Sequence, residues 1–194
     1  MPPETVPATS ARRDELLEMA YRYALEHGLA GMSLRPLAAA VQSSPRVLLF
    51  LFESKEGLVR ALLSRARADE VALLGRLGTR SEDTPAGLAA AGREIWRWLA
   101  APEHRGLLRL WLESYARALV EPEGPWGGFA AATVEDWLTL LAGAQAPAER
   151  ETRAGQTRRT LALALLRGAL LDLLASDDAE RTTRAVERGL AALE

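Results

Sequence analysis

Residues 33–58 constrain the fold most strongly, because they contain three helix-start signals in quick succession, in the stretch SLRPLAAAVQSSPRVLLFLFESKEGL. Ser33, Ser44 and Ser54 each precede a segment of helical character, and a serine hydroxyl in that place can accept a free backbone N–H of the first turn. Pro45 follows Ser44 at the first helical position, where its missing N–H is not needed. The stretch therefore predicts two short helices joined by a tight polar turn, followed at once by a longer helix.

The two short helices differ in their apolar pattern. In the first, Leu34, Leu37, Ala38 and Val41 recur at helical spacing and define one buried face. The second, residues 46–52 (RVLLFLF), is too apolar for a helix with one solvated face, so part of it must be exposed, pack on its neighbours or meet a partner. The arrangement is that of a helix-turn-helix, whose second helix can enter a DNA major groove.

These residues resemble the DNA-binding region of the tetracycline-repressor (TetR) family. The resemblance is carried by Ser33-Leu34-Arg35, the Leu37-Ala38-x-x-Val41 spacing, Ser44, Leu48 and above all Phe52-x-Ser54-Lys55-Glu56-x-Leu58. It covers residues 12–62, and the rest of the chain matches only as an all-helical pattern of suitable length. The resemblance implies a homodimer whose N-terminal heads bind a palindromic operator in double-stranded DNA and whose bodies bind a small-molecule effector.

We predict an all-α fold of about nine or ten helices, because helical spacing recurs between proline, glycine and polar breaks and no strand pattern is found. A disordered arm is expected over residues 1–9, a three-helix helix-turn-helix DNA-binding head over 10–56, and a ligand-sensing, dimerising helical bundle over 57–194. The expected helices after the head cover residues 54–77, 84–101, 102–119, 129–142, 148–175 (or from 153) and 178 onward, with a loop over 143–149.

Seven residues of the head are predicted to contact DNA: Ser33, Arg35, Ser44, Pro45, Arg46, Leu49 and Lys55. Arg46 falls in the first turn of the second short helix, where an arginine can pair bidentately with guanine O6 and N7. Ser44 and the free N–H groups beside it can bind a phosphate. The resemblance implies that Arg35 and Lys55 hold the DNA backbone on either side; the alternative is that each is a solvated surface charge.

The head also departs from the family's pattern. Gln42 stands where the family usually has glycine or a small residue, and Leu49 and Leu51 replace residues that are often phosphate-contacting tyrosine or histidine. Residues 1–60 carry seven basic and seven acidic side chains, and phosphate neutralisation drives most non-specific DNA binding. Two alternatives therefore stay open: an interaction protein whose head has lost DNA binding, and a helical carrier of apolar molecules that uses only the body.

Aromatic side chains gather in the body, which contains all five tryptophans. A cavity between its helices would be apolar, as small-molecule sites commonly are, although aromatic residues at helical spacing can equally be core. The predicted ligand-binding residues are Trp96, Leu99, Leu108, Trp111, Tyr115 and Trp137. Arg97, His104, Arg109 and Glu113 could orient a ligand or could lie at the surface.

Residues 161–174 are apolar nearly all round, which requires burial on most sides and favours a dimer. The family's four-helix interface implies that the dimer forms through helices at about 129–142 and 156–175. We predict no catalytic site, metal or cofactor, because the two histidines lack metal-ligand spacing and there is no cysteine.

No apolar run approaches the ~20 residues of a membrane span, and the lack of cysteine suits the cytoplasm. The sequence thus predicts a cytoplasmic, ligand-responsive DNA-binding transcriptional regulator that is not an enzyme. The usual mode in the family makes it a repressor released by a small apolar effector.

Overall fold

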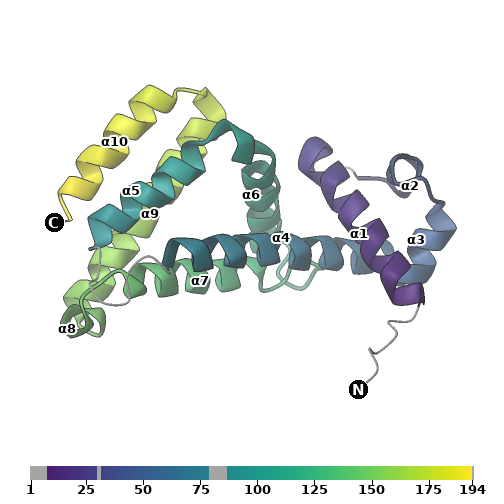
Figure 1. Cartoon of the computed structure of the whole chain (residues 1–194), viewed down its shortest axis with the longest axis horizontal. Helices are drawn as coiled ribbons and strands as arrows, with labels where there is room; N and C mark the ends of the chain where they lie inside the picture. Colours follow the sequence, from purple (N-terminus) through teal and green to yellow (C-terminus); the bar gives the residue numbers. More distant parts are fainter. Residues whose placement is uncertain (1–7, 30–31, 79–86, 194) are drawn as a thin grey trace, which may run out of the picture. The chain divides into compact units, whose positions relative to one another are not determined.

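The computed structural model describes residues 8–29, 32–78 and 87–193, and over these ranges it is helical without a strand, which confirms the all-α prediction (Figure 1). The elements, in order, are α1 (Ala8–His27), α2 (Leu34–Ala40), α3 (Pro45–Phe52), α4 (Lys55–Gly78), α5 (Leu88–Ala100), η1 (Pro102–His104), α6 (Arg105–Val120), α7 (Phe129–Gly143), α8 (Pro147–Arg150), α9 (Arg153–Ser176) and α10 (Ala179–Ala191). No helix within the described ranges is long and apolar enough to cross a membrane.

The chain divides into two compact units, each of which is described by itself. Unit 1 comprises Met1–Ala68 and Arg109–Ala130, and unit 2 comprises Asp69–Leu108 and Ala131–Glu194. The helices α4, α6 and α7 therefore pass from one unit into the other.

Local helix-start signals explain most of the boundaries. The Ser44 hydroxyl accepts the N–H of Val47 at 3.3 Å, and the Ser54 hydroxyl accepts the N–H of Gly57 at 2.9 Å. Asp178 accepts the N–H of Arg181 at 2.9 Å and so caps α10. Ser33 occupies the cap position of α2 with extended backbone, but its side chain makes no capping bond, so that part of the prediction is wrong.

Two further boundaries differ from the prediction. The expected loop over 143–149 contains the one-turn helix α8, because Pro147 takes the first helical position and the N–H groups of Glu149 and Arg150 bond back to the carbonyl of Ala146. The expected start of the helix at 84–85 lies outside the described residues; α5 is described from Leu88.

The core of unit 1 lies among α1, α2, α3 and the first half of α4. Leu37, Ala38 and Val41 are buried as predicted, and Leu34 is half-buried. The other buried side chains of this core are Leu16, Ala20, Tyr21, Ala24, Leu48, Phe52, Leu58, Val59 and Leu62. Apolar burial of this extent is what holds such short helices in place, because helices of seven or eight residues are not stable alone.

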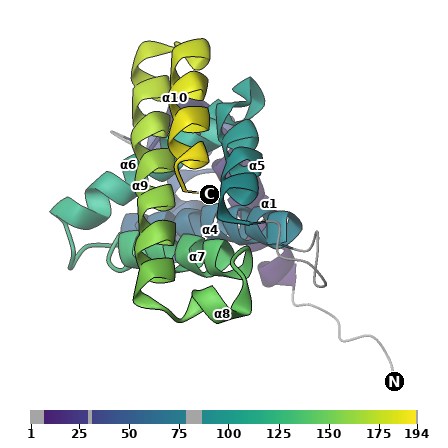
Figure 2. The same cartoon turned by 90° about the vertical axis from the view of Figure 1, so that its left-hand side faces the viewer.

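In unit 2, α5, α9 and α10 each pack against the other two and form a three-helix bundle (Figure 2). Its core side chains are Leu88, Ile95, Trp96, Leu99, Leu163, Leu166, Leu170, Leu173, Val186 and Leu190. The Trp96 indole N–H donates to the Thr183 hydroxyl at 2.9 Å and ties α5 to α10. Arg181 of α10 forms two hydrogen bonds, of 2.7 and 2.6 Å, to the carboxylate of Asp172 on α9.

Candidate nucleic-acid interface and ligand site

The turn between α2 and α3 requires an unusual backbone at Gln42. This residue has a φ of 50°, in the left-handed region that glycine enters freely and that other residues enter at a cost of about 1–2 kcal/mol. The geometry gives a physical reason why the resemblance implies a glycine at this position, but it does not explain other small residues, whose Cβ meets the same strain. Ser44 then caps α3, so the turn fixes where α3 begins.

The turn between α3 and α4 is fixed still more tightly. Glu53 has φ 67° and ψ −42°, and the N–H of Ser54 donates to the carbonyl of Phe52 at 2.7 Å, which is a γ-turn. A Cβ on Gly57 would lie only 2.0 Å from that same Phe52 carbonyl oxygen. Position 57 therefore requires glycine, although the sequence motif leaves that position open.

The structure resolves how the apolar stretch of α3 is distributed. Leu48 and Phe52 are buried, whereas Val47 and Leu49 are 38% and 39% exposed and Phe50 is 76% exposed. Arg46 is exposed on the same helix. The helix thus presents one cation together with three apolar side chains, and Phe50 was absent from the residues predicted to contact DNA.

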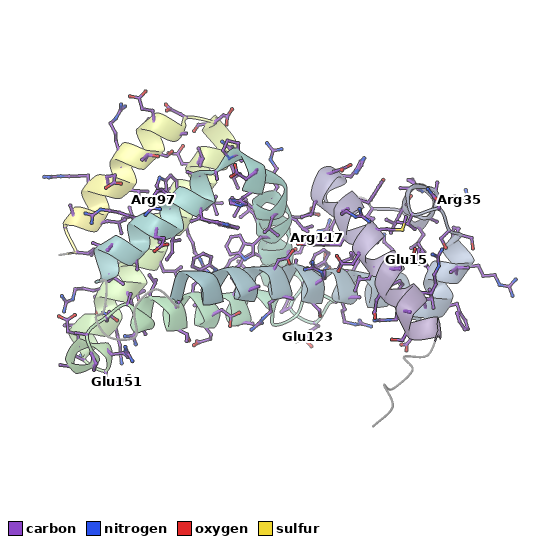
Figure 3. The ribbon with its side chains drawn as sticks, viewed as in Figure 1. Glu15, Arg35, Arg97, Arg117, Glu123 and Glu151 are labelled. Carbon is purple, nitrogen blue, oxygen red and sulfur yellow. The ribbon has the colours of Figure 1, made fainter. Side chains whose placement is uncertain are left out.

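The structure places all seven predicted DNA-contact residues in unit 1, on or directly before the helices of the helix-turn-helix and the start of α4. Arg35 (Figure 3), Arg46 and Lys55 are exposed, and no hydrogen bond or ion pair engages them within the described ranges. Ser33 and Ser44 are also exposed, Leu49 is partly exposed and Pro45 is half-buried at the first position of α3. Contact with DNA stays a prediction for each of them.

Glu113 has a role that the sequence did not reveal. Its carboxylate accepts the backbone N–H of Leu29, in the segment after α1, at 2.8 Å, and lies 3.5 Å from the guanidinium of Arg117. Arg117 (Figure 3) in turn stacks over the ring of Trp126 at 5.2 Å. The end of α1 is therefore held by a carboxylate on α6, within unit 1.

The six predicted ligand-binding residues are divided between the units. Trp96, Leu99, Leu108 and Trp137 are buried in unit 2; Trp111 and Tyr115 belong to unit 1, where their rings lie 5.3 Å apart. A pocket formed by all six therefore stays a prediction.

Among the residues considered for orienting a ligand, His104 stacks on Trp98 at 4.0 Å, and its Nδ1 lies 2.8 Å from the Trp98 carbonyl. This ring has a structural role at the start of α6. Arg97 and Arg109 are exposed.

The exposed short helix α3, which follows a tight turn and packs on the core of unit 1, is the arrangement of a helix-turn-helix. Solved structures with the same fold were therefore compared with the chain. The chain is similar to a TetR-family regulator from Cytophaga hutchinsonii (17% identity over 98% of both chains, TM-score 0.74). It is similar to a putative TetR-family regulator from Rhodococcus sp. (21% identity over 94% of this chain and 98% of that one, TM-score 0.70).

A third similar structure is the multidrug binding protein EbrR complexed with proflavin, with 26% identity over 92% of this chain and 99% of that one and a TM-score of 0.60. No protein-family model and no curated protein matches the chain. The protein has the fold of the TetR-family transcriptional regulators, which confirms the resemblance found in its sequence.

Proposed function

We propose that the protein is a TetR-family transcriptional regulator that binds DNA through α3 and is released from it by a small molecule. The observation that carries the proposal is the geometry of α3, which is fixed at both ends by backbone turns and whose exposed face carries Arg46, a residue that forms no ion pair with the described part of the chain. The protein acts in the cytoplasm as a repressor and is not an enzyme.

In this proposal Arg46 contacts a guanine and the apolar side chains beside it contact thymine methyl groups. Val47, Leu49 and Phe50 are the apolar groups available on the exposed face. Arg35 and Lys55 hold phosphates on either side of α3. Because the head carries as many acids as bases, few phosphates are neutralised, and we expect a shallow dependence of affinity on salt.

The exposed face of α9 supports a homodimer. Seven exposed residues lie on one stripe at alternating spacings of three and four: Ala154, Thr157, Leu161, Ala164, Gly168, Leu171 and Ala175. Leu161 and Leu171 are 55% and 49% exposed, and a Cβ on Gly168 would meet nothing within 4 Å. This spacing is that of a helix seam between partners, with small residues that allow close approach.

The predicted second dimer helix, α7, has less exposed apolar surface than α9. Its exposed positions in unit 2 are Ala131, Glu135, Thr139 and Gly143, none of them a large apolar residue. The proposed interface is therefore centred on α9. A dimer fits DNA recognition because two heads address half-sites about 34–36 Å apart.

Release follows from population shift. An effector that binds the DNA-incompetent arrangement of the dimer more tightly lowers operator affinity by its differential affinity for the two states. The support for a small apolar effector is the aromatic content of the body and the similarity to EbrR, a protein solved with proflavin, ethidium and imidazole.

DNA binding is tested by fluorescence anisotropy on duplex from upstream of the protein's own gene, over a series of salt concentrations. We expect binding that resists competitor DNA. We expect Arg46→Ala to lose about 1–3 kcal/mol of binding free energy at the cognate site. Arg97→Ala, the same change on α5, is the matched control. Equal affinity of the wild type and Arg46→Ala would remove Arg46 from the contacts.

The dimer is tested by sedimentation. Leu161→Glu is expected to give monomers, whereas Leu119→Glu, at an even more exposed leucine on α6, leaves the dimer intact. A dimeric Leu161→Glu variant would contradict an interface on α9.

The 76% exposure of Phe50 favours one rival, an interaction protein that uses α3 as a protein contact. Failure to bind even random duplex at low salt would replace the regulator with this rival. Binding to random duplex that weakens as salt rises would retain the regulator.

A further inference from the structure

Unit 1 contains an open pocket that shares no residue with the predicted ligand-binding set. Its volume is about 400 Å³, within the range of small-molecule sites, and it lies between α4 and the loop that leads into α7. Its lining consists of Arg60, Leu63, Ser64, Arg67 and residues 125–129.

The lining combines positive charge with apolar surface. Arg60 and Arg67 supply two guanidinium groups and Ser64 supplies a hydroxyl, and no carboxylate is among the described residues that line the pocket. Arg60 is exposed and makes no ion pair within the part of the chain that the structure describes. Leu63, Trp126 and Phe129 provide apolar walls.

The polar side of the pocket follows from helical spacing. Arg60, Ser64 and Arg67 are four and three residues apart on α4, so their side chains lie along one face of the helix. A guanidinium pairs with a carboxylate through two parallel hydrogen bonds, which makes this face suited to a carboxylate ligand.

The apolar side is preformed. Backbone hydrogen bonds of 3.0 Å (Gly127 N–H to the Gly124 carbonyl) and 3.1 Å (Phe129 N–H to the Trp126 carbonyl) hold the loop. A Cβ on Gly127 would lie 2.5 Å from the carbonyl oxygen of Pro122, so the loop packs closely on itself. Trp126 is buried and its ring is covered by Arg117.

We infer that this pocket binds an organic carboxylate with a flat apolar body, at a site separate from the predicted effector site. The carboxylate pairs with Arg60 and Arg67, and the apolar body lies against Trp126 and Phe129. The wall that it contacts is joined through Arg117 to Glu113, whose carboxylate accepts the N–H of Leu29 in the head. Glu121 and Glu123 (Figure 3) are exposed on the same loop but do not line the pocket.

The inference is tested with three probes of one shape and different charge: 1-naphthoate, 1-naphthalenemethanol and 1-naphthylmethylammonium. Calorimetric titration of the full chain is expected to show 1-naphthoate binding about tenfold or more tighter than either other probe, because only its charge is opposite to that of the two guanidinium groups. Arg60→Gln is expected to weaken the binding of 1-naphthoate by a similar factor and to leave the affinity for 1-naphthalenemethanol unchanged. Arg22→Gln, at an exposed arginine on α1 of unit 1, is the matched control.

A second variant separates this pocket from the predicted effector site. Ser64 is exposed, so Ser64→Phe fills the pocket without entering the core, and it is expected to abolish the preference for 1-naphthoate. Three results would overturn the inference: no binding of 1-naphthoate at millimolar concentration, affinity for it no greater than for the alcohol, or unchanged affinity in both Arg60→Gln and Ser64→Phe. None of these results depends on whether the protein binds DNA.

Discussion

The α3–α4 junction of unit 1 and the α5–α9–α10 bundle of unit 2 both depend on glycines at close contacts, but the contacted atoms differ. At the junction, a Cβ on Gly57 would meet the backbone carbonyl of Phe52 at 2.0 Å. In the bundle, a Cβ on Gly92 would meet the Leu190 side chain, and one on Gly189 the Leu165 side chain, each at 2.6 Å. The end of a side chain can change rotamer, whereas a backbone carbonyl within a hydrogen-bonded turn cannot move unless the whole turn changes its conformation.

This difference separates two ways of building a helical protein. The junction sets the direction of α3, so its geometry is fixed by backbone hydrogen bonds and positive φ values. The bundle needs only a filled core, and cores accept hydrophobic changes that keep total volume. Substitutions should therefore be all-or-none in the first region and graded in the second.

The largest effect is expected for Gly57→Ala. Because the methyl group would overlap the Phe52 carbonyl, the turn must open. We expect the free energy of unfolding to fall by about 3 kcal/mol or more, at the upper end of the usual range for single substitutions. Urea denaturation followed by circular dichroism measures it. Gly143→Ala, where a Cβ meets nothing within 4 Å, is the control, and equal stability of the two variants would contradict the close approach at position 57.

Gly92→Ala should cost less, about 1–2 kcal/mol, because the overlapping Leu190 methyl groups can shift. The comparison is sharpest in a double-mutant cycle: in a Leu190→Ala background the Gly92→Ala substitution should cost nothing, since the overlapping atoms are gone. Additive costs in the cycle would show that Gly92 is constrained by something other than Leu190.

Gln42→Gly is expected to stabilise unit 1 by about 0.5–1 kcal/mol, because glycine adopts the φ of 50° without strain and this relief exceeds the cost of the extra freedom that glycine has in the unfolded chain. Thermal unfolding of the variant checks this. Gln156→Gly, inside α9, should destabilise by a similar amount. A destabilising Gln42→Gly would mean that the Gln42 side chain contributes more than its backbone strain costs.

The smallest effect is expected at the Asp172–Arg181 pair of unit 2. Hydrogen bonding to Arg181 lowers the pKa of Asp172 below its ordinary value, against the opposing effect of partial burial. Because the folded pKa is the lower one, the contribution is complete above the unfolded pKa of about 3.9 and is lost as pH falls through the folded value.

Asp172→Asn should therefore lower the melting temperature slightly at pH 7 and leave it equal to that of the wild type in strong acid. Glu135→Gln, at an exposed carboxylate on α7, is expected to show no such pH-dependent difference. A wild-type advantage that persisted at the lowest pH would rule out the charged pair as its source.

The sequence predicted the features that depend on neighbouring residues. The caps at Ser44 and Ser54 and the limits of α3 were recovered because serine and proline act on the turn that directly follows. Ser33 failed because the same cap position does not oblige the hydroxyl to bond. The exposure of Phe50 could not be derived either, since VLLFLF has no polar face from which to infer the buried one.

Contacts between distant residues were beyond sequence patterns. Glu113 was interpreted as a ligand-orienting or surface residue, and only the fold brings it to Leu29. The requirement for glycine at position 57 was hidden for a related reason, because it depends on where the preceding helix ends in space. The seven DNA-contact and six ligand-binding residues stay predictions, whose tests are in solution.

The hydrogen bond from Leu29 to Glu113 also limits the exchange of head and body domains between such regulators. The donor lies after the first helix and its acceptor 84 residues further along the chain. A hybrid that joins this head to another protein's body at the α3–α4 junction would separate them and leave a partly buried amide without its acceptor, which costs about 1–3 kcal/mol. A working exchange must therefore transplant the α6 segment together with the head, so that the portable piece is discontinuous in sequence.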